Sequence, residues 1–182
     1  MLDLAAHGLH SHDLLPLPYT PATVQHVADR IKQVQDALGR ELVVENVSSY
    51  LEYRESQMPE WAFVTAVLEQ ADCGLLLDVN NIYVSARNHG FSALTYLEAL
   101  PLQRVREIHL AGYSDRGTHL LDTHSAPVSA AVWALYREAL QRSGPVPTLV
   151  EWDNDQPPLD ILLAEAVKAE AILAELKAVS GD

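Results

Sequence analysis

Leu75-Leu76-Leu77-Asp78 (residues 75–78) is one of four stretches in this chain that end a short apolar run on a carboxylate or an imidazole. Polar or turn-type residues follow each run, and a helical pattern comes after them. The last residues of the four stretches are 33, 31 and 42 positions apart, which is the repeat of a βα unit. The other three stretches are Leu42-Val43-Val44-Glu45, Arg106-Glu107-Ile108-His109 and Thr148-Leu149-Val150-Glu151.

Amphipathic segments separate these runs. Thr20 and Pro21 have the residue types of an N-cap and a first helical position, and apolar residues then recur at spacings of three and four up to Gly39. This pattern predicts a helix over 21–38. After the second run, residues 79–90 are interpreted as a long functional loop. Further helices are expected from Pro59, from Ser92 to about Leu100, from about Val128 to near Gly144, and from Pro157 to about Lys177.

The alternation of strands and helices predicts an α/β fold with a parallel sheet and right-handed crossovers. The apolar runs are contiguous rather than alternating, so we expect strands buried on both faces. A complete (β/α)₈ barrel of the TIM type needs roughly 250 residues. The 182 residues therefore predict a single domain, 1–182, that is either an open sheet or an incomplete TIM-type barrel with about five of eight βα units.

Composition excludes several classes of function. The net charge of −13 comes without a Lys/Arg cluster, so binding of nucleic acid is disfavoured. A single cysteine, Cys73, rules out a disulfide framework within the chain. We find no signal peptide and no apolar run of ~20 residues, so no membrane association is expected and the predicted location is the cytoplasm.

The residues that end the strands predict a metal site. In a barrel the carboxyl ends of the strands meet at one mouth, where catalytic groups collect. Carboxylates and imidazoles without thiolates suit iron(II), manganese, zinc or cobalt, and so many ligands suggest more than one ion. Asp122 and His124 lie two apart and would face the same way in an extended segment. The candidate ligands are Glu45, Asp78, Asn81, His109, Asp122, His124 and Glu151.

Four other histidines are weaker candidates. His89 lies in the segment after the second strand and is a possible group behind the ligands or on the substrate side. His7, His10 and His12 could also contribute. No catalytic residue is assigned from the sequence. The chain has no dinucleotide-binding glycine loop, P-loop or nucleophile elbow.

The chain resembles a known family over about residues 10–170. The similarity lies in HDLLPLPYT (12–20), ENVSSYL (45–51), MPEW (58–61), CGLLLDVNNIYVSARNHGF (73–91), EIHLAGYSD (107–115), DTHSAPV (122–128), WALY (133–136) and PTLVEWDND (147–155). Together these strings resemble the multinuclear non-haem iron-dependent oxidative enzymes, which include the catalytic subunit of methanobactin biosynthesis.

This resemblance implies a TIM-type barrel with two or three iron ions (Fe²⁺/Fe³⁺) at its mouth. It also implies O₂-dependent oxidation of cysteine residues in a ribosomally made precursor peptide, which a partner protein helps to present. Asn81 matches an asparagine of the family's DVNN motif. Family members carry further strands before the DLLP motif, so the chain is expected to be an N-terminally truncated member. The residues that match ligand positions are Glu45, Asp78, His109, Asp122, His124 and Glu151.

Two other interpretations remain open at this stage. Sugar isomerases and endonucleases with a divalent-metal barrel also place Glu, Asp and His at strand ends. Alternatively, a truncated chain could bind metal or a partner without turnover.

Overall fold

Four parallel strands form the central sheet of this protein. The computed structural model describes residues 5–6, 9–10 and 15–180. The sheet has the order β3-β4-β5-β8, with strands β3 (Val43–Glu45), β4 (Gly74–Asp78), β5 (Val105–Leu110) and β8 (Thr148–Val150). Strand order follows chain order, so each new strand joins the same edge, as in a TIM barrel and unlike a doubly wound sheet. The prediction of an α/β fold with a parallel sheet is confirmed, but this sheet is not closed, and β3 and β8 are its edges.

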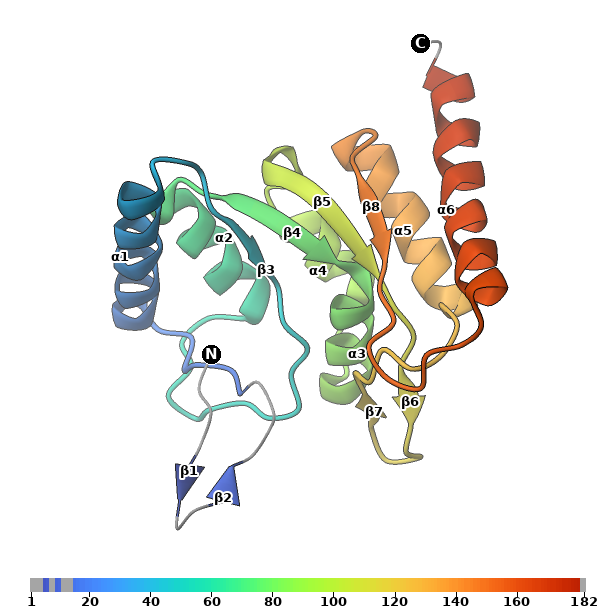
Figure 1. Cartoon of the computed structure of the whole chain (residues 1–182). Coiled ribbons are helices and arrows are strands. Elements are labelled where there is room, and N and C mark those ends of the chain that lie inside the picture. Colours follow the sequence, from blue (N-terminus) through green and yellow to red (C-terminus); the bar gives the residue numbers. More distant parts are fainter. Residues whose placement is uncertain (1–4, 7–8, 11–14, 181–182) are drawn as a thin grey trace.

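Helices lie behind and beside the sheet (Figure 1). They are α1 (Pro21–Leu38), α2 (Glu60–Ala71), α4 (Ala93–Ala99), α5 (Ala130–Ser143) and α6 (Leu159–Ser180), and each contacts the next. One hydrophobic core runs from α1 to α6 and includes the fully buried Leu75 and Leu77 of β4. Alternate residues of the strands therefore face the helices, while Asp78 and His109 point to the opposite face.

Local sequence signals fix the helix ends where they were predicted. The hydroxyl of Thr20 accepts a hydrogen bond from the backbone N–H of Thr23 at 3.2 Å, and Gly39 ends α1 in the left-handed conformation at φ 63°. Ser92 and Ser129 cap α4 and α5 in the same way. The predicted helix over residues 21–38 is confirmed.

The segment after β4 corrects the sequence interpretation. Residues predicted as a long loop form helix α3 (Val79–His89). Asp78 caps this helix through its side chain, and Gly90 ends it with φ 79°. The prediction failed because α3 buries polar side chains, including Asn80, Asn81 and Ser85, so the usual apolar stripe is interrupted.

The edge strands also differ from prediction. Strand β4 is buried apart from the half-buried Leu76, as its contiguous apolar run suggests. In contrast, Val43 of β3 and Leu149 of β8 are 38% and 45% exposed. Among the described residues each edge strand pairs with a strand on one side only, and Val43 and Leu149, on the face away from the helices, stay partly exposed. Burial on both faces is therefore wrong for β3 and β8.

Smaller elements complete the described part of the chain. Strands β1 (Ala5–Ala6) and β2 (Leu9–His10) form an antiparallel pair, as do β6 (Ser114–Asp115) and β7 (Leu120–Leu121). A 3₁₀ turn, η1 (Leu102–Arg104), leads into β5. The carboxyl ends of the four parallel strands point to the side on which α3 and the β6–β7 hairpin lie (Figure 1). Among the described helices, none is long and apolar enough to cross a membrane.

The buried centre of β4 provides a test of this core. Leu77 is 0% exposed, so Leu77→Ala would leave a cavity between sheet and helices and lower the free energy of unfolding by about 2–5 kcal/mol. Leu38→Ala, at a position 59% exposed, is the control and should change it by less than about 1 kcal/mol. Urea unfolding followed by circular dichroism measures both. Equal losses for the two variants would contradict this core.

Candidate metal centre

Four of the predicted ligands come together at the carboxyl end of the sheet. Glu45 ends β3, Asp78 ends β4, His109 lies near the end of β5 and Glu151 follows β8. One ligand atom from each lies within 4.8 Å of those of the other three, and we call these four residues the first group. The parallel register explains this meeting, because Asp78 pairs with His109 across β4 and β5.

A second group shares one member with the first. It consists of His124, Glu151 and Asp153, whose ligand atoms also lie within 4.8 Å of one another. Glu151 Oε2 is 3.1 Å from His109 Nδ1 and 3.4 Å from His124 Nδ1. His124 Nδ1 also lies 3.2 Å from Asp153 Oδ2. Glu151 therefore stands between the two groups and can serve both.

Asp122 joins the second group from the segment after β7. Its Oδ1 lies 2.8 Å from His124 Nε2 and accepts a hydrogen bond from the side-chain amide of Asn80 at 2.7 Å. Ser48 donates to Asp122 Oδ2 at 3.0 Å. A cavity of about 300 Å³ opens here, and its lining includes five of the seven predicted ligands, namely Glu45, Asn81, Asp122, His124 and Glu151.

The backbone around His124 is unusual. Asp122 and His124 do meet, but not through the simple extended geometry that the sequence suggested, because His124 adopts φ 47°. A left-handed histidine costs free energy, and such residues collect at functional sites. The carbonyl of His124 accepts hydrogen bonds from the backbone N–H groups of Asp153 and Asn154 at 2.8 and 3.3 Å. Segment 122–124 is thereby fixed to the loop that follows β8.

Gly112 makes room for this segment. A Cβ atom at position 112 would lie 2.0 Å from the carbonyl oxygen of Ala126 and 2.8 Å from that of Pro127. Only glycine allows the chain after His124 to pass so close to the end of β5.

Asp78 has two separate roles at the centre of the site. Its Oδ1 accepts a hydrogen bond from the backbone N–H of Asn81 at 2.7 Å and so caps α3. Its Oδ2 is buried and has no hydrogen-bond partner within the described part of the chain. Asn46 fixes the backbone around this residue, since it donates to the carbonyl of Asp78 and accepts from its N–H, both at 2.9 Å.

Other buried polar atoms share the situation of Asp78 Oδ2. Within residues 15–178, Asn81 Oδ1 and both ring nitrogens of His124 are buried without a well-directed hydrogen bond, although the ring nitrogens lie close to carboxylates. Buried polar groups are nearly always satisfied, so several unsatisfied polar atoms in one place need an explanation. A cation fits, because Asp78 Oδ2, Asn81 Oδ1 and one ring nitrogen of deprotonated His124 can each donate a lone pair to a metal.

Electrostatics support the same conclusion. Burial raises the pKa of Asp78 well above its usual value, and the neighbouring Asp122 raises it further against the opposing hydrogen bond from Asn81. Burial also raises the pKa of Glu45, with His109 opposing and Glu151 adding to the rise. Burial alone would lower the pKa of His124, but Asp122, Asp78 and Glu151 outweigh it and raise this pKa to about 9. The site therefore contains more acidic than basic side chains, and the acids repel one another.

Several candidates lie elsewhere, and one ligand candidate was missed. The ring of His89 contacts Ser49, with Nε2 2.9 Å from the hydroxyl, rather than either metal group. His7 and His12 lie outside the described residues, as does the side chain of His10. Asp153 was not predicted because it follows the strand end, yet the spacing Glu151-x-Asp153 was a usable signal.

Comparison with known proteins places the chain in a family. The profile of the RiPP precursor modification enzymes MbnB/TglH/ChrH matches residues 4–174, where RiPP stands for ribosomally synthesised and post-translationally modified peptide. The chain belongs to this family. The resemblance noted in the sequence is thus confirmed at the level of the family.

Three similar proteins are named as UPF0276 proteins. A UPF0276 protein of Acaryochloris marina is 54% identical over 172 residues, which are 94% of this chain and 62% of that protein. A UPF0276 protein of Anaeromyxobacter sp. is 56% identical over 167 residues, 92% of this chain and 59% of the relative. A third, from Paraburkholderia phytofirmans, is 50% identical over 92% of this chain and 56% of its own length. The chain spans about three fifths of the length of these relatives.

Asp78→Asn separates stability from metal binding. The amide oxygen can keep the cap on α3, while the buried charge is removed, so we expect the metal-free chain to gain about 0.5–2 kcal/mol in free energy of unfolding near pH 7. Because the folded pKa of Asp78 is raised, this gain should grow as pH rises. Affinity for Co²⁺ should fall by more than about 100-fold. Thermal unfolding and Co²⁺ titration measure the two effects, with the exposed Asp36→Asn as control; a destabilised Asp78→Asn protein would argue against this account.

Metal uptake should release protons. In the metal-free chain the ring of His124 is protonated below about pH 9, and it must be deprotonated to hold a cation. Affinity for Co²⁺ should therefore rise with pH towards 9, by up to about tenfold per pH unit for each proton displaced. Calorimetry near neutral pH in two buffers of different ionisation enthalpy counts the protons. Identical heats in both buffers would refute the expected protonation of the site.

Proposed function

We propose that this chain supplies much of a multinuclear iron centre in an enzyme that oxidises cysteine residues of a ribosomally made precursor peptide with O₂. The observation that carries the proposal is the shared carboxylate, Glu151, between two ligand groups with only oxygen and nitrogen donors. Such donors suit borderline first-row metals, and a carboxylate between two groups suits two or three ions rather than one. Family membership supports the peptide substrate.

The ligand set follows from this geometry. Glu45, Asp78, His109 and Glu151 would hold one ion, and His124 with Asp122 and Asp153 would hold another that Glu151 also contacts. Asn81 is 5% exposed, and its side-chain oxygen Oδ1 has no hydrogen-bond partner among the described residues. This oxygen is a further, neutral metal ligand. Iron, when bound, supplies the one-electron redox chemistry that these side chains lack.

The protein's own residues orient and shield this centre. Asn46 joins the end of β3 to the end of β4 through both hydrogen bonds to Asp78, and the amide of Asn81 donates to the carbonyl of Asn46 at 3.0 Å. These bonds hold Glu45 and Asp78 at a fixed separation before metal arrives. Tyr83 and Tyr113 stack at 5.4 Å between ring centroids and offer an aromatic wall after β4 and β5 for an approaching peptide.

The architecture proposed for the active protein is a TIM-type barrel of which this chain forms a single partial domain. A singly wound sheet with ligands at its carboxyl end is the expected arrangement of such a barrel. Closing it requires additional parallel strands between β8 and β3, and those strands would add groups to the same mouth. A partner protein that presents the peptide and a location in the cytoplasm also belong to this proposal.

Anaerobic titration with Fe²⁺ tests the metal centre. We expect at least two ions per chain, and Glu151→Gln should weaken both, by more than about 100-fold, since it serves both groups. Glu175→Gln, at an exposed position that pairs with Arg137, is the matched control and should bind as the unmodified chain does. Binding of no more than trace iron, or a Glu151→Gln protein with unchanged stoichiometry and affinity, would overturn the proposal.

The reaction is tested separately. Oxygen consumption by the iron-loaded protein in the presence of a cysteine-containing peptide, and not of the same peptide with serine, is the expected result. Turnover of a ketose or of abasic DNA instead would favour the isomerase or endonuclease alternative. Iron binding without any oxygen consumption would favour a metal-binding protein without turnover.

A further inference from the structure

One ligand-bearing segment, residues 122–124, is not part of the central sheet. Asp122 and His124 follow the two-residue strand β7, whose one strand partner among the described residues is β6. The sheet register that fixes Asp78 and His109 therefore cannot fix them. Something else must hold this segment if Asp122 is to reach the site reproducibly.

Asn88, in the last turn of α3, provides that hold. Its Oδ1 accepts a hydrogen bond from the backbone N–H of Leu120 at 2.8 Å, and its Nδ2 donates to the carbonyl of the same residue at 3.0 Å. The side-chain amide thus bonds to β7 as a neighbouring strand would. The same Nδ2 also donates to the carbonyl of Ser49, at the longer distance of 3.4 Å.

We propose that Asn88 is a positioning residue of the metal centre, which holds Asp122 in place through Leu120 and the loop around Ser49. This inference rests on the proposed function, because it assumes that Asp122 contributes to metal binding. Asn88 itself touches neither of the two ligand groups and acts only through the segments that it ties together.

The loop at residues 46–50 completes the hold from the other side. The hydroxyl of Tyr50 accepts a hydrogen bond from the backbone N–H of Asp122 at 3.0 Å, and Ser48 donates to the carboxylate of the same residue at 3.0 Å. Asp122 is therefore fixed by its backbone and by its side chain to the loop that Asn88 also contacts.

Buried groups anchor this loop in turn. Ser49 donates to Glu60 Oε2 at 3.1 Å, and its backbone N–H donates to the hydroxyl of Ser85 at 3.0 Å. His89 Nε2 lies 2.9 Å from the Ser49 hydroxyl, which gives this histidine a place behind the site. Glu60 is 7% exposed, and Tyr96 donates to its Oε1 at 2.8 Å. The anchor thus reaches the buried core.

Helix α3 connects these contacts with the first group of ligands. It begins on Asp78, which is both its cap and a proposed ligand, and its last turn carries Asn88. Asn88 lies ten positions after Asp78, which is a rise of about 15 Å along a helix. Because a helix of this length is stiff, α3 sets the position of the Asp122 segment relative to Asp78. Asn80 in its first turn bonds to the Asp122 carboxylate, and the amide of Asn88 in its last turn fixes the backbone at Leu120.

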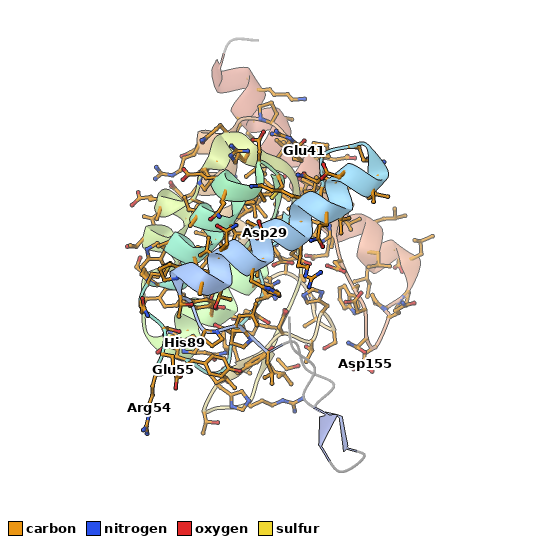
Figure 2. The ribbon with its side chains drawn as sticks, turned by 90° about the vertical axis from the view of Figure 1, so that its left-hand side faces the viewer. Asp29, Glu41, Arg54, Glu55, His89 and Asp155 are labelled. Carbon is orange, nitrogen blue, oxygen red and sulfur yellow. The ribbon has the colours of Figure 1, made fainter. Side chains whose placement is uncertain are left out.

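The chain offers a matched control in Gln35. Its side-chain amide makes the same pair of bonds to backbone, since Nε2 donates to the carbonyl of Ala71 at 3.0 Å and Oε1 accepts from the N–H of Leu42 at 2.8 Å. Like Asn88, it is half-buried. These bonds lie next to Glu41, at the opposite end of the molecule from His89 (Figure 2). Losing them removes equivalent contacts far from the site.

The experiment compares Asn88→Ala with Gln35→Ala by anaerobic titration of each metal-free chain with Co²⁺. Asn88→Ala should lower metal affinity by about 10–100-fold and change the visible absorption of the bound Co²⁺, as expected for loss of a group behind the ligands. Gln35→Ala should lower the urea midpoint to a similar extent while its affinity and spectrum stay as in the unmodified chain. Hydrogen exchange of the metal-free proteins should be faster at the amides of Leu120 and Asp122 only in Asn88→Ala.

Each other outcome decides against the inference. Unchanged affinity and spectrum in Asn88→Ala, while the unmodified chain binds Co²⁺, overturn the role of Asn88 and leave the proposed function intact. Equal loss of affinity in both variants shows general destabilisation and also overturns it. Failure of the unmodified chain to bind Co²⁺ or Fe²⁺ overturns the proposed function together with this role. If Asn88→Ala does not fold, Asn88→Asp, which keeps the acceptor for Leu120 and loses the donor, is expected to shift affinity in the same direction.

Discussion

The buried carboxylate of Asp78 is the constraint on which the site depends. An ionised group without solvent is costly, and here it is surrounded by other acids rather than by a permanent cation. Its Oδ1 caps α3, and its Oδ2 has no hydrogen-bond partner among the residues that the structure describes. Local structure and metal binding thus draw on the same side chain. A cation compensates the charge, whereas neutralisation by a proton removes a ligand, so stability of the metal-free chain and function oppose each other.

The sheet and the polar contacts divide the task of placing ligands. Parallel register fixes the ends of β3, β4 and β5, and these are the ligands that a sequence pattern can reveal. Segment 122–124 has no register with the central sheet, and its place depends on side-chain amides, hydroxyls and the left-handed backbone of His124. Polar contacts of this kind are short-range and geometric. They make the second group more sensitive to single substitutions than the first.

This division also explains how much could be predicted from the sequence. The strand ends, the cap at Thr20 and the helix 21–38 follow from local chemistry, and the structure agrees with them. Helix α3 was missed because its buried polar residues serve the site rather than the core, so hydrophobic periodicity is lost where function is concentrated. Asp153 was missed because a loop, not a strand, brings it to His124. The exposure of Val43 depends on which strand lies at an edge, and no local pattern specifies that.

The two open edges bear on the same site. Strands β3 and β8 carry proposed ligands at their ends, but each is hydrogen-bonded on one side only within the central sheet. Their residues facing away from the helices, Val43 and Leu149, keep much of their apolar surface in water, which is unfavourable for a sheet that stands alone. Strands added at these edges would bury that surface and hold Glu45 and Glu151 from both sides. A closed barrel would therefore improve packing and metal geometry together, because both depend on the same two strands.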